Sequence, residues 1–132
     1  MGDKQLCKMD GRSYEPTNGA HPLQAMFEAQ RGFSKRMGLD FSALSLAQRE
    51  AGVKEDVLCL TVEAVELLNW TNWKDWKKEK QDFLMEQARF EVADIMAFLM
   101  RTAMRLGMDH EDLFQYYMRK VEINHERQDR NY

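Results

Sequence analysis

Two pairs of acidic residues with the same spacing are the part of this sequence best suited to chemistry. The segment TVEAVELLNW at 61–70 carries Glu63 and Glu66, and the segment FEVADIMAFL at 90–99 carries Glu91 and Asp94. No Lys or Arg lies three or four residues from Glu63, Glu66 or Asp94, so these acids have no helical ion-pair partner on their own segments. Solvated acids on amphipathic helices are the simpler explanation for one such pair, but the repeat makes a joint role the better interpretation.

On helices, the two acid pairs occupy the same position relative to an apolar stripe. Antiparallel packing of the two stripes would bring four carboxylates together at one edge of the seam. There they would repel one another and lose solvation, and a divalent cation relieves both costs. Oxygen ligands favour Mg²⁺, with Mn²⁺ as a second choice. The stripes consist of Val53, Val57, Leu60, Ala64 and Leu67, and of Ala88, Val92, Ile95 and Leu99.

Two other metal chemistries fit the sequence less well. A di-iron bundle usually uses Glu-x-x-His motifs, whereas the third positions here are Glu66 and Asp94. A phosphohydrolase of the HD type needs paired His-Asp ligands, and none of the three histidines has that setting. These histidines are His21, His110 and His125. The acids therefore predict a Mg²⁺ site that acts on a phosphate compound.

The elements that would position these acids are all helical. Apolar periodicity predicts helices over about 22–38, 53–69, 82–106 and 110–127, with Pro22 in a first turn and Asp109 as an N-cap. Residues 39–52 are expected to form a connection, with room for a short helical turn, and 1–21 a polar N-terminal arm outside the domain at 22–132. The predicted fold class is all-α, an arrangement of four to five helices, since no strand alternation of useful length is present.

Composition is that of one globular domain without a nucleic-acid or membrane partner. The 132 residues are 31% charged and 44% hydrophobic, with a net charge of −3. No apolar run has the length of a membrane span, and the start of the chain has no signal-peptide pattern. Cys7 and Cys59 lack a metal-type spacing and are expected to be free thiols, which favours a cytoplasmic location.

The motifs together resemble a known superfamily. The order E-x-x-E, 24 residues, then E-x-x-D is similar to that of the all-α nucleoside triphosphate pyrophosphatases, which include dimeric all-α dUTPases and MazG-like enzymes. The stretch ELLNWTNWKDWKK at 66–78 resembles the segment after the first acid pair in these dUTPases. YYMRKVEINHERQDRNY at 116–132 resembles their C-terminal signature, with Lys120, Asn124, Arg127, Gln128 and Tyr132.

The resemblance implies Mg²⁺-dependent hydrolysis of a nucleoside triphosphate to the monophosphate and pyrophosphate. It implies that Glu63, Glu66, Glu91 and Asp94 hold the metal and that one glutamate orients the water. Lys120, Asn124 and Arg127 would face the phosphates, and they share one helical face. Gln30, Asn69, Trp73 and Lys77 are candidates for nucleotide binding, with Trp70, Trp76, Lys74 and Lys78 as further possibilities. The first substrate to expect is dUTP, with dCTP, dATP or dGTP as rivals.

Two further expectations concern assembly and an alternative function. Exposed apolar residues on four helices would favour a homodimer or a dimer of dimers. A non-catalytic helical interaction module is the competing hypothesis, because ten Met and three Trp suit an adaptable binding surface. Such a module would gain no stability from Mg²⁺.

Overall fold

The computed structural model describes residues 6–130, apart from the side chain of Thr17, and contains four α-helices after a short 3-10 turn, η1 (Thr17–Gly19). The helices are α1 (Pro22–Arg36), α2 (Leu46–Asn69), α3 (Met85–Arg105) and α4 (His110–Asp129). No strand occurs in this part of the chain. The prediction of an all-α fold is therefore confirmed. Tyr132 and the first five residues of the arm lie outside the described range.

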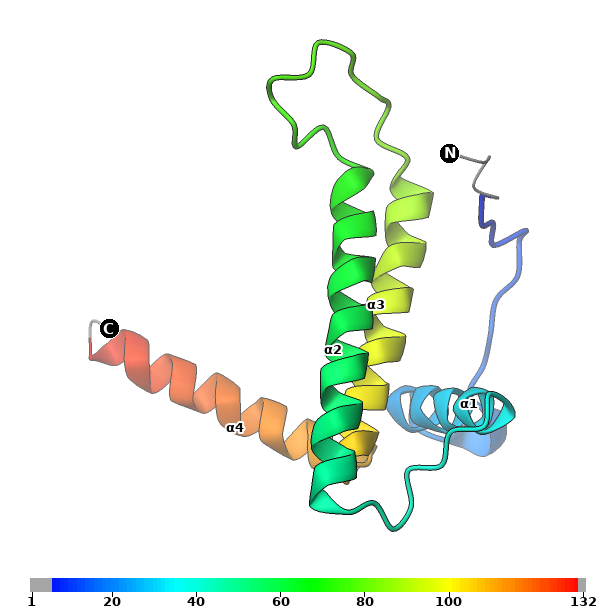
Figure 1. Ribbon diagram of the computed structural model, residues 1–132, viewed down its shortest axis with the longest axis vertical. Helices are drawn as coiled ribbons and strands as arrows, with labels where there is room; N and C mark the ends of the chain where they lie inside the picture. Colours follow the sequence, from blue (N-terminus) through cyan, green and yellow to red (C-terminus); the bar gives the residue numbers. More distant parts are fainter. Residues whose placement is uncertain (1–5, 131–132) are drawn as a thin grey trace.

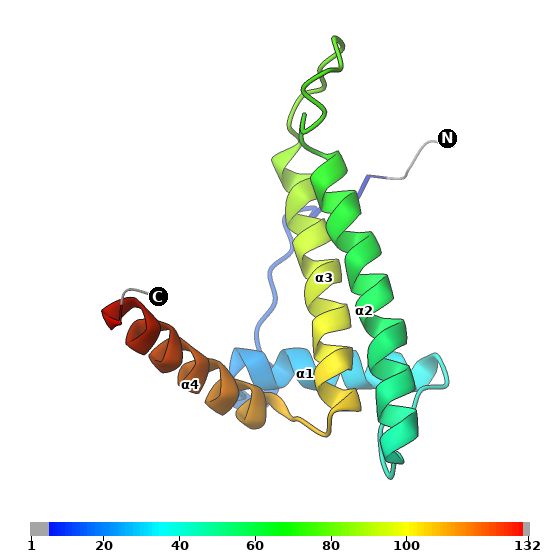
Figure 2. The ribbon, with the colours of Figure 1, turned by 60° about the vertical axis from the view of Figure 1, so that its left-hand side comes forward.

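The centre of the fold is a long antiparallel hairpin of α2 and α3 (Figure 1). The segment between them, residues 70–84, forms an extended loop at one end of the hairpin. At the other end α1 crosses both helices, and α4 leaves this region and points away from the hairpin (Figure 2). None of the residues of α4 is buried.

Local sequence signals explain where most of the helices begin and end. Pro22 occupies the first turn of α1, as predicted, and Gly38 follows the helix with a φ of 83°. Asp109 caps α4 and forms a reciprocal capping box with Asp112. Residues 39–45 form the predicted connection, but residues 46–52 belong to α2 rather than to the connection, because Ser45 and Gln48 form a second capping box that starts the helix at Leu46. The third helix begins at Met85 rather than near residue 82.

The apolar core is small and lies where α1 crosses α3. Phe27 is 1% exposed and packs with Met100, Ala103 and Met104. Leu23, Met96 and Leu113 pack against this group from three different helices. The core therefore fixes α1 against the C-terminal half of α3. It does not extend to the N-terminal half of α3.

The seam between α2 and α3 is more polar than the sequence predicts. Val57, Val92 and Leu99 of the predicted stripes are 44%, 55% and 42% exposed. Asp56 is instead fully buried in the seam. The packing faces are thus rotated from the apolar stripes toward the charged residues, because charged groups paired across the seam satisfy one another there.

An ion cluster around the buried Asp56 joins α2 and α3 near the start of α2. Asp56 Oδ1 forms an ion pair with Arg101 Nη2 at 2.7 Å, and Asp56 Oδ2 accepts a hydrogen bond from Arg105 Nε at 3.1 Å. Gly52, one turn before Asp56, leaves the space that the Arg105 side chain occupies: a Cβ built on Gly52 would lie 2.5 Å from Arg105 Cδ. Gly in a helix interior costs stability, and here it makes room for a buried ion pair.

We expect Gly52→Ala to lower the free energy of unfolding by about 1–3 kcal/mol, because the methyl group displaces Arg105 from Asp56. Gly32→Ala is the matched control, since Gly32 is also helical and has no atom within 4 Å of the position of a Cβ. That change should stabilise the protein by up to about 1 kcal/mol through helix propensity. Urea unfolding of both variants measures the difference. Equal stabilisation by the two substitutions would contradict the role assigned to Gly52.

Candidate metal centre and adjoining pocket

Three carboxylates from two helices converge in the α2–α3 seam. Oxygen atoms of Glu63, Glu66 and Glu91 lie within 4.8 Å of one another, and Glu91 is buried. The convergence follows from the antiparallel hairpin, which brings the second half of α2 beside the first half of α3. Asp94 is exposed and lies outside this group of three, although it lines the same pocket.

The electrostatics of this group favour a bound cation. The pKa of Glu63 is raised from 4.5 to about 7, first by burial and then by the negative charges of Glu66 and Asp94. Contacts with the carboxyl groups of Glu66 and Glu91 add to the shift, since they are favourable only when a proton is shared. Within residues 6–130, Oε2 of Glu63 is buried and has no hydrogen-bond partner. A divalent cation would satisfy that oxygen and remove the repulsion.

Trp70 orients one of the converging carboxylates. Its indole Nε1 donates to Oε1 of Glu91 at 3.1 Å, from the residue that follows α2 to the first half of α3. Trp70 lies four residues after Glu66, so helical periodicity places it on the same face as the acids. The sequence identified Trp70 as one of the further candidates for nucleotide binding, and the structure places it beside the carboxylates.

The pocket is about 300 Å³ in volume and extends along four turns of α3. The lining side chains of α3 follow a spacing of three and four residues and include Gln87, Glu91, Asp94, Phe98 and Arg101. Gln30 and Phe33 of α1 line the same pocket, so the placement of Gln30 agrees with the expected nucleotide-binding role. Cavities of this size accommodate small ligands.

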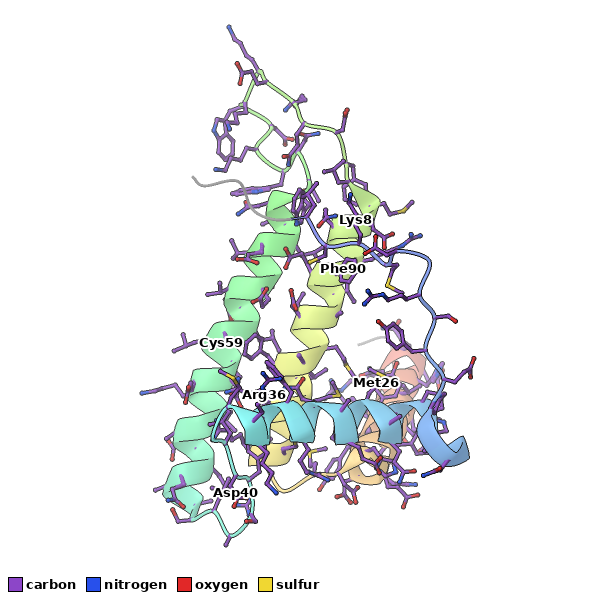
Figure 3. All side chains as sticks on the ribbon, turned by 90° about the vertical axis from the view of Figure 1, so that its right-hand side faces the viewer. Lys8, Met26, Arg36, Asp40, Cys59 and Phe90 are labelled. Atoms are coloured by element: carbon purple, nitrogen blue, oxygen red, sulfur yellow. The ribbon has the colours of Figure 1, made fainter. Side chains whose placement is uncertain are left out.

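The N-terminal arm also lines the pocket, which the sequence did not indicate. The backbone N–H of Cys7 donates to Gln87 Oε1 at 3.1 Å, and Gln87 Nε2 donates to the carbonyl of Cys7 at 2.9 Å. Figure 3 shows the arm at Lys8 beside the segment of α3 that carries Phe90. Cys7, in the segment predicted to lie outside the domain, thus lines the pocket together with the acids.

The other candidates in the 70–84 region stabilise the loop instead. Asn69 Oδ1 accepts from Trp73 Nε1 at 3.1 Å, and the ring of Trp73 packs edge-on against Trp76. Lys77 is exposed, and none of Asn69, Trp73, Trp76 and Lys77 lines the pocket. The structure does not bring these residues to the acids, because their side chains are engaged within the loop or face solvent.

The predicted phosphate-binding residues also lie apart from the acids within one chain. Lys120, Asn124 and Arg127 are exposed on α4, which points away from the hairpin (Figures 1 and 2). None of the three lines the pocket. The pocket-lining residues that the sequence did not identify are Cys7, Phe33, Gln87, Phe90, Ala97, Phe98 and Arg101. A helical wheel of α3 centred on Glu91 and Asp94 would have found the five of these seven that lie on α3.

One comparison with known proteins identifies a family. A family model described as dUTPase matches residues 22–110, about two thirds of the chain. The matched range includes the four acids and Gln30, and it leaves out the arm and nearly all of α4. Searches of curated proteins and of solved structures return no match. No helix in the described part of the chain is long and apolar enough to cross a membrane.

The shifted pKa of Glu63 makes stability depend on pH in a defined direction. The folded protein keeps the Glu63 proton up to about pH 7, whereas the unfolded chain releases it near 4.5. Between these values the folded state binds more protons, so the stability contributed by Glu63 falls as pH rises through this window. We expect the melting temperature of EDTA-treated protein to be higher at pH 5 than at pH 8.

Glu63→Gln tests the assignment, because it removes the titrating group and preserves its shape. The melting temperature of this variant should change less between pH 5 and pH 8 than that of the wild type. A pH dependence identical to that of the wild type would show that another group is responsible.

Proposed function

We propose, since the chain belongs to the all-α dUTPase family of nucleoside triphosphate pyrophosphatases, that it hydrolyses a deoxynucleoside triphosphate in a Mg²⁺-dependent reaction. The first substrate to expect is dUTP, and its products are the nucleoside monophosphate and pyrophosphate. The observation that carries this proposal is the convergence of Glu63, Glu66 and Glu91 at one end of a pocket large enough for part of a nucleotide.

The donor set fits a hard divalent cation. Three carboxylates offer oxygen ligands only, and one of their buried oxygens, Oε2 of Glu63, lacks a partner in the part of the chain that the structure describes. Glu63, Glu66 and Glu91 would hold the ion, and Asp94 would join them from the next turn of α3 or hold a second ion. When bound, Mg²⁺ supplies charge neutralisation for the phosphates and lowers the pKa of coordinated water.

The chain itself supplies positioning and proton transfer. In the reaction, a bond forms between a water oxygen and the α-phosphorus while the bond from that phosphorus to the bridging oxygen of pyrophosphate breaks. One of the converging carboxylates accepts the proton that the water loses. Trp70 fixes the orientation of Glu91 through its indole N–H, and the indole shields the carboxylate from solvent. Gln30 contributes a polar side chain to the opposite wall of the pocket.

Pyrophosphate release tests the reaction, and Glu91→Gln tests the site. Wild-type protein with Mg²⁺ should convert dUTP to dUMP and pyrophosphate, without releasing orthophosphate. Glu91→Gln should lower turnover by roughly 10²-fold to 10³-fold or more, because it removes a ligand charge. The fold should survive, since the glutamine carbonyl still accepts from Trp70. Mg²⁺ at about 100 times its Kd should raise the stability of the wild type by about 2.7 kcal/mol.

Glu86→Gln is the matched control, since Glu86 lies on the same helix, pairs with Arg89 and does not line the pocket. Its turnover should equal that of the wild type. Release of orthophosphate alone, or full activity of Glu91→Gln, would contradict the proposal.

We further propose that the protein works as a homodimer or a dimer of dimers whose site is completed across subunits. Apolar side chains of α2 are exposed along one face, among them Leu58 at 61% and Val62 at 57%. A second copy packed on this face would remove that apolar area from water. The exposed position of Lys120 and Asn124, away from the acids of the same chain, is explained if they serve the pocket of a partner.

Mixing two inactive variants tests the shared site. Glu91→Gln disables the carboxylate end, and Lys120→Ala disables the basic face of α4. If each site combines acids from one chain with α4 from another, an equal mixture should regain up to about a quarter of wild-type activity, because about one site in four receives both intact halves. Activity is measured after unfolding and refolding the two proteins together. Sites contained within one chain would give no recovery.

A further inference from the structure

Arg101 is a partly buried cation at the far end of the acidic pocket, and the roles assigned above do not use it. It is the one basic side chain that lines this pocket within residues 6–130. The side chain is 16% exposed, and its guanidinium lies over the ring of Phe98, with Cζ 5.2 Å from the ring centroid. A charged group with limited access to water at a pocket wall is available to a ligand with oxygen acceptors.

Asp56 holds the guanidinium without using all of its donors. Arg101 Nη2 forms an ion pair with Asp56 Oδ1 at 2.7 Å. Arg101 Nε is buried and has no hydrogen-bond partner in the described part of the chain, so the guanidinium can reach a ligand only through its terminal nitrogens. Arg105 occupies the other oxygen of Asp56, so one buried carboxylate faces two cations. The cluster therefore keeps an excess positive charge. A ligand in the pocket can contact this charge through Arg101, which lines the pocket, whereas Asp56 and Arg105 do not.

The pocket has two chemically different ends. Trp70, Glu91 and Gln87 mark the end near the 70–84 loop, where the metal ligands lie. The other end is marked by Arg101 and Phe98, together with Phe33 from α1, because α1 packs on the C-terminal half of α3. Arg101 follows Asp94 by seven residues, which is about 10 Å along the helix axis. This separation is comparable with that between the α-phosphorus and the outer edge of a pyrimidine base.

We propose that Arg101 is a specificity-determining residue that donates a hydrogen bond to the 4-carbonyl oxygen of a pyrimidine base. The inference rests on the proposed function, since it assumes that the phosphates lie at the carboxylate end. The base then lies against Phe98 and Phe33, whose rings can stack on it. Of the polar groups on the ring, the 4-position lies farthest from the sugar and therefore closest to Arg101.

The chemistry at this position separates uracil from cytosine. Uracil carries a carbonyl oxygen there, which accepts a hydrogen bond, whereas cytosine carries an amino group, which donates. Arg has donors only, so an amino group beside Arg101 would leave two donors facing each other in a site with little water. Asp56 acts as a positioning residue, because it fixes the guanidinium and cannot itself reach the pocket through the side chain of Arg101.

Arg101→Met and Arg105→Met form a matched pair of tests. Both remove one cation from Asp56, and only Arg101 lines the pocket. We expect the wild type to favour dUTP over dCTP in kcat/KM. Arg101→Met should lower this preference by roughly 10-fold to 100-fold, the value of a hydrogen bond to a charged donor, and Arg105→Met should leave it unchanged. Arg101→Lys, which keeps the charge beside Asp56, should retain part of the preference and serves if the methionine variant fails to fold.

Calorimetric binding of dUMP and dCMP provides a readout that does not need turnover. The wild type should bind dUMP more tightly than dCMP, and Arg101→Met should lose that difference. An unchanged dUTP-to-dCTP ratio in both Arg101 variants, or an equal fall in the Arg101 and Arg105 variants, would overturn the inference and leave the pyrophosphatase reaction standing. A wild-type preference for dCTP over dUTP would also overturn the inference about Arg101 without contradicting the pyrophosphatase reaction. Absence of pyrophosphate release with a retained, Arg101-dependent preference for dUMP would instead overturn the proposed function alone.

Discussion

The repulsion among carboxylates in the α2–α3 seam is the constraint on which the rest of the structure depends. Two helices that pack through apolar side chains gain stability from every contact, whereas here Glu63, Glu66 and Glu91 share a space with little water. Burial and mutual repulsion of these carboxylates raise the pKa of Glu63 to about 7, so that a proton retained near neutral pH reduces the negative charge. A site that is unfavourable when empty and ionised gains the most from a cation, so stability and metal binding are linked.

The same seam contains a second charged cluster, whose net charge is positive rather than negative. Asp56, Arg101 and Arg105 satisfy one another near the point where α1 crosses, and Gly52 makes the space that Arg105 needs. The two clusters lie about two helical turns apart along the hairpin. This separation gives the pocket an acidic end and a cationic end. A molecule with phosphates at one end and a hydrogen-bonding ring at the other matches such a gradient.

The distribution of apolar side chains favours an oligomer over a single chain. The core around Phe27 is small, and much of the apolar surface of α2 and α3 faces outward. The polar seam is the reason: residues that would have formed an apolar interface between the two helices are rotated to the outside, where another copy can cover them. The projection of α4 away from the hairpin (Figure 2) has the same consequence, because Lys120 and Asn124 are exposed on this helix and do not line the pocket of their own chain.

Local signals in the sequence determined most of the elements of this protein. Pro22, Asp109 and the absence of strand alternation were enough for the all-α fold and for three of the four helix starts to within a few residues. The repeated acid spacing was enough to select Glu63, Glu66 and Glu91, because a three-residue step on a helix keeps side chains on neighbouring faces. Only the tertiary structure decided which faces meet. The apolar stripes predicted the seam only in part: Ala88 is buried and Leu60, Leu67 and Ile95 are partly buried, whereas Val57, Val92 and Leu99 are exposed and the charged Asp56 is buried. The roles of Cys7 and Arg101 were equally hidden, since each depends on a neighbour that is distant in sequence and adjacent only after folding.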